Sequence, residues 1–275
     1  MKIDAHQHFW QFDPVRDSWI DDSMKILQND FMPDDLKPLL EQTGFDGCVA
    51  VQADQSENET RFLLNLAGEF EFIKGVVGWV DLKASNLEQR LENFSQFSKL
   101  KGFRHIIQAE PDGFMVNPQF VEGVKKLHEF QFTYDILILE HQLEECINFV
   151  KSLPEMPLVI DHLAKPDIKN RSFDKWAERM KKLAVSPNVH VKLSGMVTET
   201  DLGNWTREEF TPYLETCLDC FGAYRLMIGS DWPVCLLGGS FEQVIGIVEE
   251  FARGLSQSDY DAIMGQSAKN FYNLT

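Results

Sequence analysis

The amino-acid sequence predicts an α/β protein built as one (β/α)8 barrel, the TIM-barrel architecture. Eight short apolar segments rich in β-branched residues recur along the 275 residues, and segments with a helical pattern separate them. This alternation is typical of parallel strands joined by crossover helices. Polar residues stand at the ends of the strand segments, where barrel enzymes place their chemistry. A doubly wound open sheet is the alternative architecture.

The eight strand segments are runs of seven or nine residues, exemplified by KIDAHQH near the N-terminus and the valine-rich GCVAVQA and IKGVVGWVD that follow. Each is short enough for a buried strand of a parallel sheet. We expect strands at residues 2–8, 47–53, 73–81, 101–107, 132–138, 157–163, 189–195 and 225–231.

The intervening segments have helical patterns, and Ser-Asn-Leu-Glu at 85–88 and Ser-Pro-Asn at 186–188 are typical helix boundaries. We expect helices at residues 33–43, 57–70, 85–98, 117–130, 141–152, 172–185, 207–222, 240–254 and 257–273. Neither a linker rich in Gly, Ser or Pro nor an internal repeat interrupts this order. We therefore expect residues 1–275 to form a single domain.

A long segment, residues 10–32, separates the first strand from its helix. It carries Trp10, Phe12, Trp19 and Phe31, and this aromatic content argues against disorder. Loops of this length in compact domains are usually functional or disordered. We expect either a cover over the mouth of the barrel or a packed surface loop.

The composition excludes several classes of function. The net charge is −17, and no cluster of Lys or Arg offers a surface for phosphates, so nucleic acid is not an expected partner. No apolar run reaches the roughly 20 residues of a membrane span. The N-terminus lacks the pattern of a signal peptide, and the five cysteines fit packing roles in a reducing compartment. We therefore expect a cytoplasmic protein.

Polar residues fall at or near the end of every strand segment. Because the carboxyl ends of barrel strands meet at one face, these side chains are expected to converge there. Random surface polarity would not favour these positions, so their regularity indicates an enzyme. In chain order they are His6 and His8, Gln52 and Asp54, Trp79 and Asp81, Arg104 and His105, Asp135, Asp161 and His162, Lys192 and Ser194, and Ser230 and Asp231.

His6 and His8 are two residues apart on the first strand. Side chains alternate along a strand, so both imidazoles point to the same side and can look into the barrel mouth together. Two imidazoles there can ligate a divalent metal or polarise a carbonyl group. A buried structural role is the alternative for each histidine.

Asp231 ends the eighth strand, which lies beside the first in a closed barrel. This placement brings its carboxylate next to His6 and His8. An aspartate in that position can act as a general base on water or complete a metal site. Capping of the following segment is the alternative.

The chain resembles the amidohydrolase superfamily and, within it, the sugar-lactonase subgroup that includes L-fuconolactonase and L-rhamnonolactonase. The resemblance spans nearly the whole chain. The motifs that carry it are DAHQHFW at 4–10, Gln52 with ETR at 59–61, GFRH at 102–105, DHLAKP at 161–166, KLSG at 192–195, GSDWPV at 229–234 and IMGQSAKNFY at 263–272.

The resemblance implies at most one divalent ion, because two ligands of the binuclear members are missing. Those members carry a bridging lysine or glutamate on strand 4 and a histidine on strand 5. Here strand 4 offers Arg104 and His105, and strand 5 offers Asp135. A single zinc or manganese held by His6, His8, His162 and Asp231 is one possibility, and a metal-independent enzyme is the other.

The activity implied by the resemblance is hydrolysis of a sugar lactone to the aldonic acid. Asp231 would activate water, while His6, His8 and His162 would stabilise the oxyanion with or without a metal. Either the protonated Asp231 or a histidine would then protonate the departing ring alkoxide. A lactone is more reactive than an amide, which fits the missing metal ligands.

Several further side chains are candidates for binding the substrate. Arg104 and Lys165 are cations expected near the mouth, with ion pairing to acidic neighbours as the alternative. Trp79 and Trp232 would present rings to the apolar face of a sugar, with core packing as the alternative. Gln52 would donate to a hydroxyl group.

Two other activities and one non-enzymatic role stay open at this point. A single-metal decarboxylase of aromatic acids would need a complete set of metal ligands, including the missing histidine of strand 5, and a more apolar pocket. Hydrolysis of a pyrone-dicarboxylate lactone would want several arginines for two carboxylates. A barrel used only for binding would make the polar strand ends dispensable. The sequence also leaves a homodimer open.

Overall fold

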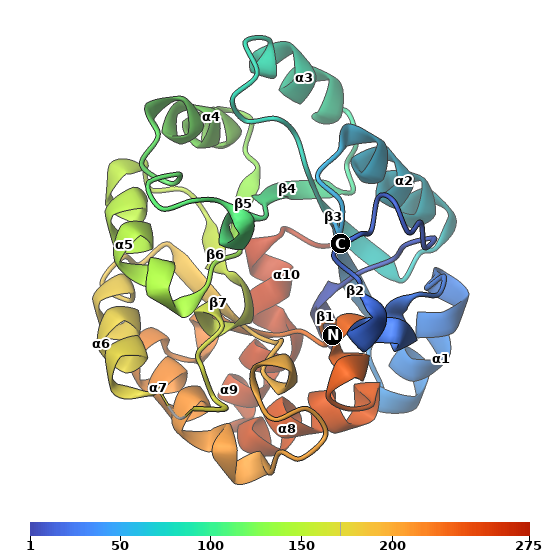
Figure 1. The fold of residues 1–275 in the computed structure, drawn as a ribbon, viewed down its shortest axis with the longest axis vertical. Coiled ribbons are helices and arrows are strands. Elements are labelled where there is room, and N and C mark those ends of the chain that lie inside the picture. Colours follow the sequence, from blue (N-terminus) through green and yellow to red (C-terminus); the bar gives the residue numbers. More distant parts are fainter. Residues whose placement is uncertain (171) are drawn as a thin grey trace.

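Eight parallel strands form a nearly closed barrel with helices around it (Figure 1) in the computed structural model, which describes residues 1–170 and 172–275. The strands pair in sequence order, so the expected barrel is confirmed and the open doubly wound sheet is wrong. They are β1 Ile3–Gln7, β2 Gly47–Val51, β3 Ile73–Gly78, β4 Leu100–His105, β5 Thr133–Ile136, β6 Leu158–Ile160, β7 Val189–Leu193 and β8 Leu226–Ile228.

The barrel closes where β1 meets the residues that follow β8. Gln7 and Trp232 form a parallel bridge there. The backbone N–H of His8 donates to the carbonyl of Trp232 (2.7 Å), and the N–H of Asp231 donates to the carbonyl of His6 (2.8 Å). The first and last strands of the barrel are therefore neighbours. This arrangement places Asp231 beside His6 and His8.

The expected helices are present, and several of them are shorter than expected. In the segment 207–222 the α-helix begins only at Thr211, after a short 3₁₀ helix at Arg207–Glu209. Pro212 occupies its first turn, where a missing N–H costs no hydrogen bond. The helices are α1 Pro33–Thr43, α2 Glu57–Glu69, α3 Leu87–Phe94, α4 Pro118–Glu129, α5 Leu143–Ser152, α6 Asp174–Leu183, α7 Thr211–Phe221, α8 Phe241–Arg253, α9 Gln257–Asp261 and α10 Ser267–Phe271.

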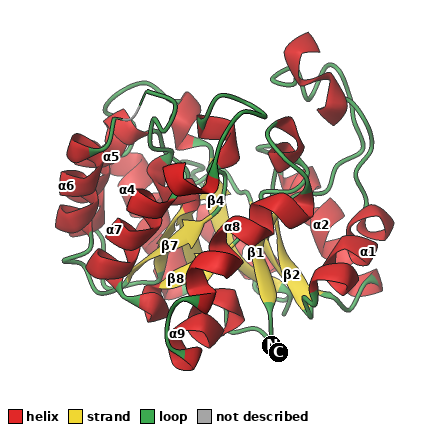
Figure 2. Cartoon of the chain, turned by 90° about the horizontal axis from the view of Figure 1, so that it is seen from below, coloured by secondary structure: helices red, strands yellow, loops and turns green. Residues whose placement is uncertain are grey.

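The segment 257–273 is not one helix, because a π-helical turn over Ala262–Gln266 separates α9 from α10. Gly265 in this turn packs against the start of β1. A Cβ atom there would lie 2.1 Å from the carbonyl oxygen of Met1, so only glycine permits the approach. Both termini consequently lie together at one end of the sheet (Figure 2).

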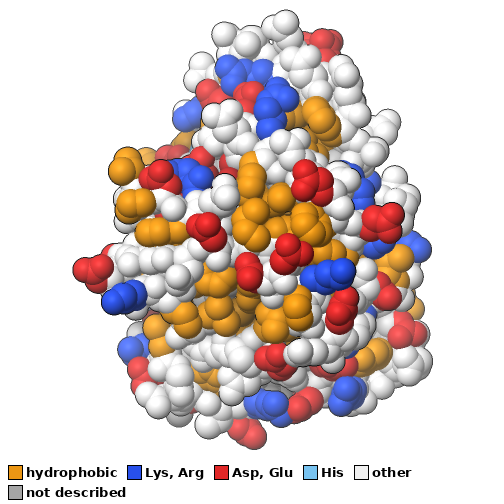
Figure 3. Space-filling model, turned by 90° about the vertical axis from the view of Figure 1, so that its right-hand side faces the viewer, with side chains coloured by type: hydrophobic (Ala, Val, Ile, Leu, Met, Phe, Trp, Pro, Cys, Tyr) orange, Lys and Arg blue, Asp and Glu red, His pale blue; other side chains and the backbone are white. Residues whose placement is uncertain are grey.

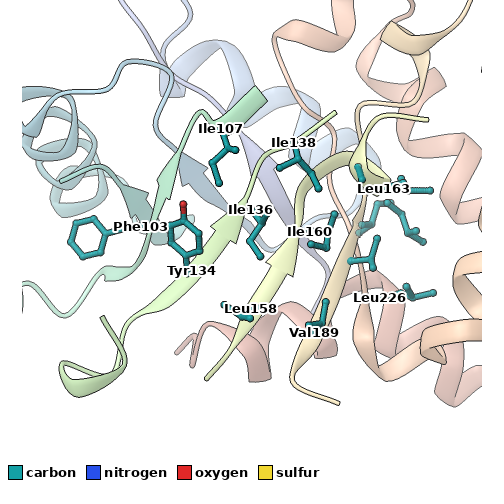
Figure 4. Packing of buried hydrophobic residues seen from close by; sticks show 14 of the residues in the cluster. Phe103, Ile107, Tyr134, Ile136, Ile138, Leu158, Ile160, Leu163, Val189 and Leu226 are labelled. Atoms are coloured by element: carbon teal, nitrogen blue, oxygen red, sulfur yellow. The ribbon is translucent and has the colours of Figure 1, made fainter. Parts of the chain in front are cut away.

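The main core lies between the sheet and the surrounding helices. Figure 4 shows side chains of neighbouring strands packed in this layer, including Phe103, Tyr134, Ile136, Leu158 and Ile160. A second cluster joins Val49, Val77, Val159 and Met227 of four strands to Phe271, Tyr272 and Leu274 at the end of the chain. The last helix therefore packs against the barrel strands and closes the end away from the polar strand ends.

The long segment 10–32 is ordered over its whole length. Trp10 and Phe31 form an antiparallel bridge at its two ends, and a short helical turn spans Asp22–Leu27. Trp10, Ile20 and Leu27 form a small buried cluster beneath it. Trp19 is 44% exposed and nevertheless lines the cavity described below. The segment is thus a packed loop that also supplies part of the cavity wall.

The surface carries acidic and basic side chains interspersed around a central area of hydrophobic ones on the face seen in Figure 3. That face shows no continuous basic area. Among the helices of residues 1–170 and 172–275, none is both long enough and apolar enough to cross a membrane. The homodimer stays a prediction.

Candidate active site

A cavity of about 310 Å³ opens at the carboxyl ends of the strands. Its polar lining comes from β4 and from the segments that follow β1, β2, β4, β6 and β8, so the barrel brings together residues far apart in the sequence. The polar lining residues are His8, Gln55, Arg104, Gln108, His162, Lys165 and Asp231, and the apolar ones are Trp10, Trp19, Ala53, Ile106, Ala109, Leu137 and Val234.

His6 and His8 face each other at the end of β1, with 3.2 Å between their Nε2 atoms. The Nδ1 atom of His8 lies 2.8 Å from the carbonyl oxygen of Val51, which can only accept. Nδ1 of His8 therefore carries the proton, and its Nε2 presents a lone pair to the cavity. Burial lowers the pKa of His6 well below its ordinary value, and the nearby ammonium of Lys192 adds to that effect.

Asp231 sits among three histidines. Its Oδ1 atom lies 3.4 Å from Nε2 of His8 and 3.8 Å from Nε2 of both His6 and His162. The backbone at Asp231 is left-handed (φ 57°), a conformation that aspartate tolerates better than most residues. Burial alone would raise its pKa, but His162 and the other two histidines outweigh burial and hold the pKa below its ordinary value. Asp231 is therefore a carboxylate at neutral pH.

His162 reaches the cavity through an unusual left-handed turn. Residues 162–165 all have positive φ angles between 47° and 58°. Gly195 makes room for the imidazole, because a Cβ atom there would lie 2.6 Å from Nδ1 of His162. The Nδ1 atom is 2.8 Å from the hydroxyl of Ser194. Burial lowers the pKa of His162 to about 4, so the ring is neutral at physiological pH.

Asp4 joins the two strands that carry His6 and Asp231. Its carboxylate accepts hydrogen bonds from the hydroxyl (2.6 Å) and backbone N–H (2.8 Å) of Ser230 and from the N–H of His6 (3.2 Å). Burial raises its pKa to about 6 despite these bonds. The contact fixes β1 against the segment after β8 beside His6 and Asp231.

Lys192 of β7 is fully buried behind the cavity, and we assigned it no role from the sequence. Its ammonium lies 2.5 Å from Oδ2 of Asp135, 3.0 Å from Oδ1 of Asp161 and 3.0 Å from Nδ1 of His6. Tyr272 donates a further hydrogen bond to Asp135 (2.7 Å). The sequence did contain a signal for this role, because Lys192 stands between the apolar Val191 and Leu193 of a strand segment. A lysine is almost never fully buried unless it is paired, so its position indicates an acidic partner.

Arg104 connects this buried cluster to the cavity. One of its Nη atoms lies 3.1 Å from Oδ2 of Asp161 and 3.3 Å from Nε2 of His6. The other donates to the carbonyl of Gln52. Its Nε has no hydrogen-bond partner among the described residues. Arg104 therefore brings a fixed positive charge to the group formed by His6, His8, His162 and Asp231.

The remaining predicted binding residues lie in different environments. Lys165 lines the cavity and lies 3.9 Å from Glu199, so it is close to an acidic partner. Gln52 is fully buried and donates to the carbonyl of Arg104 (3.2 Å). Trp79 hydrogen-bonds His105 (3.3 Å). Trp232 packs against Phe9 and Phe31. Gln52, Trp79 and Trp232 are not part of the described cavity lining.

Two side chains that sequence reasoning did not single out line the cavity instead, Gln55 and Gln108. Each stands in a loop a few residues beyond a strand. Strand-end counting therefore missed them, and no residue pattern marks them. Their positions depend on how the loops after β2 and β4 fold over the barrel mouth.

The nitrogen and oxygen atoms of His6, His8 and Asp231 fit a single divalent ion. Potential ligand atoms from the three residues lie within 4.8 Å of one another, as do those of His6, Asp161 and His162. The 3.2 Å between the two Nε2 atoms agrees with about 3.3 Å expected for tetrahedral zinc with Zn–N bonds of 2.0–2.1 Å. The bond from Nδ1 of His8 to Val51 is the support that ligating histidines usually have. Arg104, also close to His6 Nε2, would compete with an ion for that lone pair.

Comparison with known proteins gives concordant results. An L-fucono-1,5-lactonase of Burkholderia multivorans is 38% identical over 286 residues, which cover 100% of this chain and 96% of that protein. An L-rhamnono-gamma-lactonase of Scheffersomyces stipitis is 27% identical over 168 residues, covering 54% of this chain and 50% of that protein.

A crystal structure of an amidohydrolase from Burkholderia multivorans with bound zinc superposes with a TM-score of 0.96 at 38% identity, covering 100% of both chains. The family model described as amidohydrolase matches residues 3–274. The match thus includes both the histidines of β1 and the closing helix. This chain belongs to the amidohydrolase family.

Proposed function

We propose that this protein is a lactone hydrolase that opens a sugar lactone of the L-fuconolactone or L-rhamnonolactone type to the aldonic acid. The observation that supports this proposal most strongly is the position of the Asp231 carboxylate, 3.4–3.8 Å from the Nε2 atoms of three buried histidines, of which His8 and His162 line the cavity. The identity to an L-fucono-1,5-lactonase over the whole chain supports this substrate class. We also propose that residues 1–275 form a single domain.

Asp231 is suited to act as the general base. Its depressed pKa keeps it ionised, so it can take a proton from a water molecule as the water oxygen bonds to the lactone carbonyl carbon. The carbonyl oxygen then becomes an oxyanion. When the ring C–O bond breaks, the protonated Asp231 returns its proton to the departing alkoxide. A positioned acid–base group of this kind typically contributes about 10²–10⁴ in rate.

The oxyanion would be stabilised by His162 and the guanidinium of Arg104, which line the cavity, and by His6 and His8 through an ion held between them. His6 lies 3.3 Å from Arg104, so a positive charge already stands beside the imidazoles. Donors fixed in a buried site need no reorganisation during the reaction, and loss of one commonly costs about 10²–10³ in rate.

We further propose that His6, His8 and Asp231 hold one divalent ion, zinc or manganese, with His162 beside it. When bound, such an ion would polarise the lactone carbonyl and add positive charge near the oxyanion. Asp231 and the three histidines hold and orient the reactants in either case.

The polar lining favours a neutral sugar lactone over a dicarboxylate. Among the described residues, Arg104 and Lys165 are the cations of the cavity, and Arg104 is bonded to Asp161 and the carbonyl of Gln52. Two substrate carboxylates would need more free cations than this lining offers. The five cysteines are unpaired, which supports our proposal of a reducing, cytoplasmic location.

The decisive experiment measures acid release from a panel of L- and D-sugar lactones with a pH indicator, before and after treatment with a chelator. We expect turnover of 6-deoxy-L-sugar lactones well above the spontaneous rate and loss of that turnover in Asp231→Asn. Turnover that survives chelation would remove the ion from the proposal and leave the lactonase activity standing. No acceleration for any lactone, with zinc or manganese added, would overturn the proposed function.

A further inference from the structure

The wall of the cavity formed by the loop after β4 carries two carboxamides in an otherwise apolar setting. Gln108 belongs to this loop, and Gln55 reaches it from the loop after β2. Ile106, Ala109 and Leu137 line the cavity beside them. Polar groups in an apolar wall make ligand binding specific, because a ligand without matching polar groups leaves them without hydrogen bonds.

The orientation of the Gln55 carboxamide is fixed by the backbone. The N–H of Ile106 donates to Oε1 of Gln55 at 2.8 Å. Because a backbone N–H can only donate, the atom that faces it is the carbonyl oxygen of the side chain. The amide nitrogen, Nε2, therefore points elsewhere, and none of the described residues accepts a hydrogen bond from it. Gln55 offers the cavity two N–H donors.

Gln108 is the second carboxamide of this wall. Its Oε1 atom is buried and has no hydrogen-bond partner among the described residues. An unsatisfied buried carbonyl costs free energy unless a ligand or water pairs with it. Gln108 thus leaves a buried acceptor unpaired, two residues along the chain from the point where Gln55 bonds Ile106.

The loop that holds these groups is firmly attached. The N–H of Gln108 donates to the carbonyl of Leu137 (3.0 Å), and the side chain of Gln142 donates to the carbonyl of Ile107 (3.2 Å). With the bond from Ile106 to Gln55, three contacts from the loops after β2 and β5 hold residues 106–108 in place. A rigid donor and acceptor lose little entropy when they bind a ligand.

We propose that Gln55 and Gln108 are the specificity-determining residues that recognise neighbouring hydroxyl groups of the lactone ring. Nε2 of Gln55 donates to one hydroxyl oxygen, and the carboxamide of Gln108 pairs with the next hydroxyl. This inference rests on the proposed lactonase function. It assigns to Gln55 and Gln108 the role that the sequence suggested for Gln52, whose side chain is fully buried and occupied by the carbonyl of Arg104.

Two variants separate recognition from folding. Gln55→Glu keeps the oxygen that accepts from Ile106 and replaces the donating amide by an oxygen. Gln108→Met keeps the length of the side chain and removes the carboxamide. Gln119→Met, at an exposed position on α4, is the matched control. The unfolding transition of each variant shows whether the fold is intact.

The measurement is kcat and KM for the best lactone substrate and for its ring-deoxy analogues, each of which lacks one hydroxyl. For the full substrate we expect each Gln variant to lower kcat/KM about 10-fold, mainly through KM, as for loss of one neutral hydrogen bond. For the analogue that lacks the recognised hydroxyl, the variant and the wild type should differ less than 2-fold. Gln119→Met should match the wild type throughout.

The outcomes distinguish this inference from the proposed function. If the wild type hydrolyses the lactone but the Gln variants discriminate against every deoxy analogue as strongly as the wild type does, the recognition role is wrong and the lactonase activity stands. A uniform loss of kcat for all substrates would likewise contradict it. If the wild type hydrolyses no lactone, the proposed function fails first.

Discussion

The ammonium nitrogen of Lys192 lies 3.0 Å from Nδ1 of His6, on the opposite side of the imidazole from the Nε2 atom that faces His8 and Asp231. The same ammonium also lies close to Asp135 (2.5 Å) and Asp161 (3.0 Å). The buried ion cluster thus supports the first histidine of the site from behind. Through Lys192 the cluster connects β7 to β5, to the residue after β6 and to β1.

Replacing Lys192 with Met should destabilise the protein strongly. Asp135 and Asp161 would lose their main cationic partner, and breaking a buried ion pair typically costs about 3–5 kcal/mol of the free energy of unfolding. We expect kcat to fall as well, since His6 would lose one of its supports. Urea unfolding and turnover of the lactone measure the two effects.

The exposed Lys181→Met on α6 is the control and should change neither quantity. Adding Asp135→Asn to Lys192→Met should recover part of the lost stability, because it removes one of the unpaired carboxylates. A Lys192→Met variant as stable as the wild type would show that the cluster does not stabilise the fold.

Asp231→Asn should lower kcat by about 10²–10⁴, because an amide cannot take the proton of the attacking water. The substitution keeps the shape of the side chain, so KM should change much less than kcat. Steady-state kinetics with the best lactone give both constants. Asp219→Asn, exposed on α7, should behave as wild type. Equal kcat in Asp231→Asn and wild type would exclude Asp231 as the base.

Glu59 should make the protein less stable as pH rises. Burial raises its pKa from 4.5 to about 7, although the N–H of Ala53 donates to its carboxylate (3.2 Å) and partly opposes that shift. The folded state therefore binds more protons than the unfolded state between pH 4.5 and 7. The resulting stability is full below pH 4.5 and is lost as pH rises through about 7.

Glu59→Gln removes this titration while keeping the oxygen that accepts from Ala53. We expect the variant to be more stable than the wild type at pH 8 by about 3 kcal/mol, the equivalent of a 2.5-unit shift. At pH 4.5 the difference should be much smaller. Urea unfolding at both pH values tests this, and a difference independent of pH would contradict it.

Zinc should bind with one equivalent per chain, and His8→Gln should abolish that binding. Equilibrium dialysis gives the stoichiometry independently of activity. An ion present at about 100 times its Kd should raise the free energy of unfolding by about 2.7 kcal/mol, visible as a higher Tm. His128→Gln, at an exposed position on α4, should bind zinc as the wild type does. Equal zinc binding by His8→Gln would show that the ion lies elsewhere.

Parts of the structure follow from local rules and could be predicted. The eight strand segments and their intervening helices appear where apolar runs and helical patterns indicated them. The helix pattern over 257–273 is interrupted because Gly265 must pack against Met1, a contact 264 residues away in the chain. No local pattern contains that information.

The sequence by itself determined the barrel, the convergence of the strand ends, and the pairing of His6 and His8 with Asp231. These follow from the two-residue period of a strand and from the neighbourhood of the first and last strands of a barrel. Only the tertiary structure decided that Lys192 supports His6 from behind, and that Gln55 and Gln108 line the cavity in place of Gln52. Those positions depend on loop paths and on contacts between distant residues, which no spacing along the chain encodes.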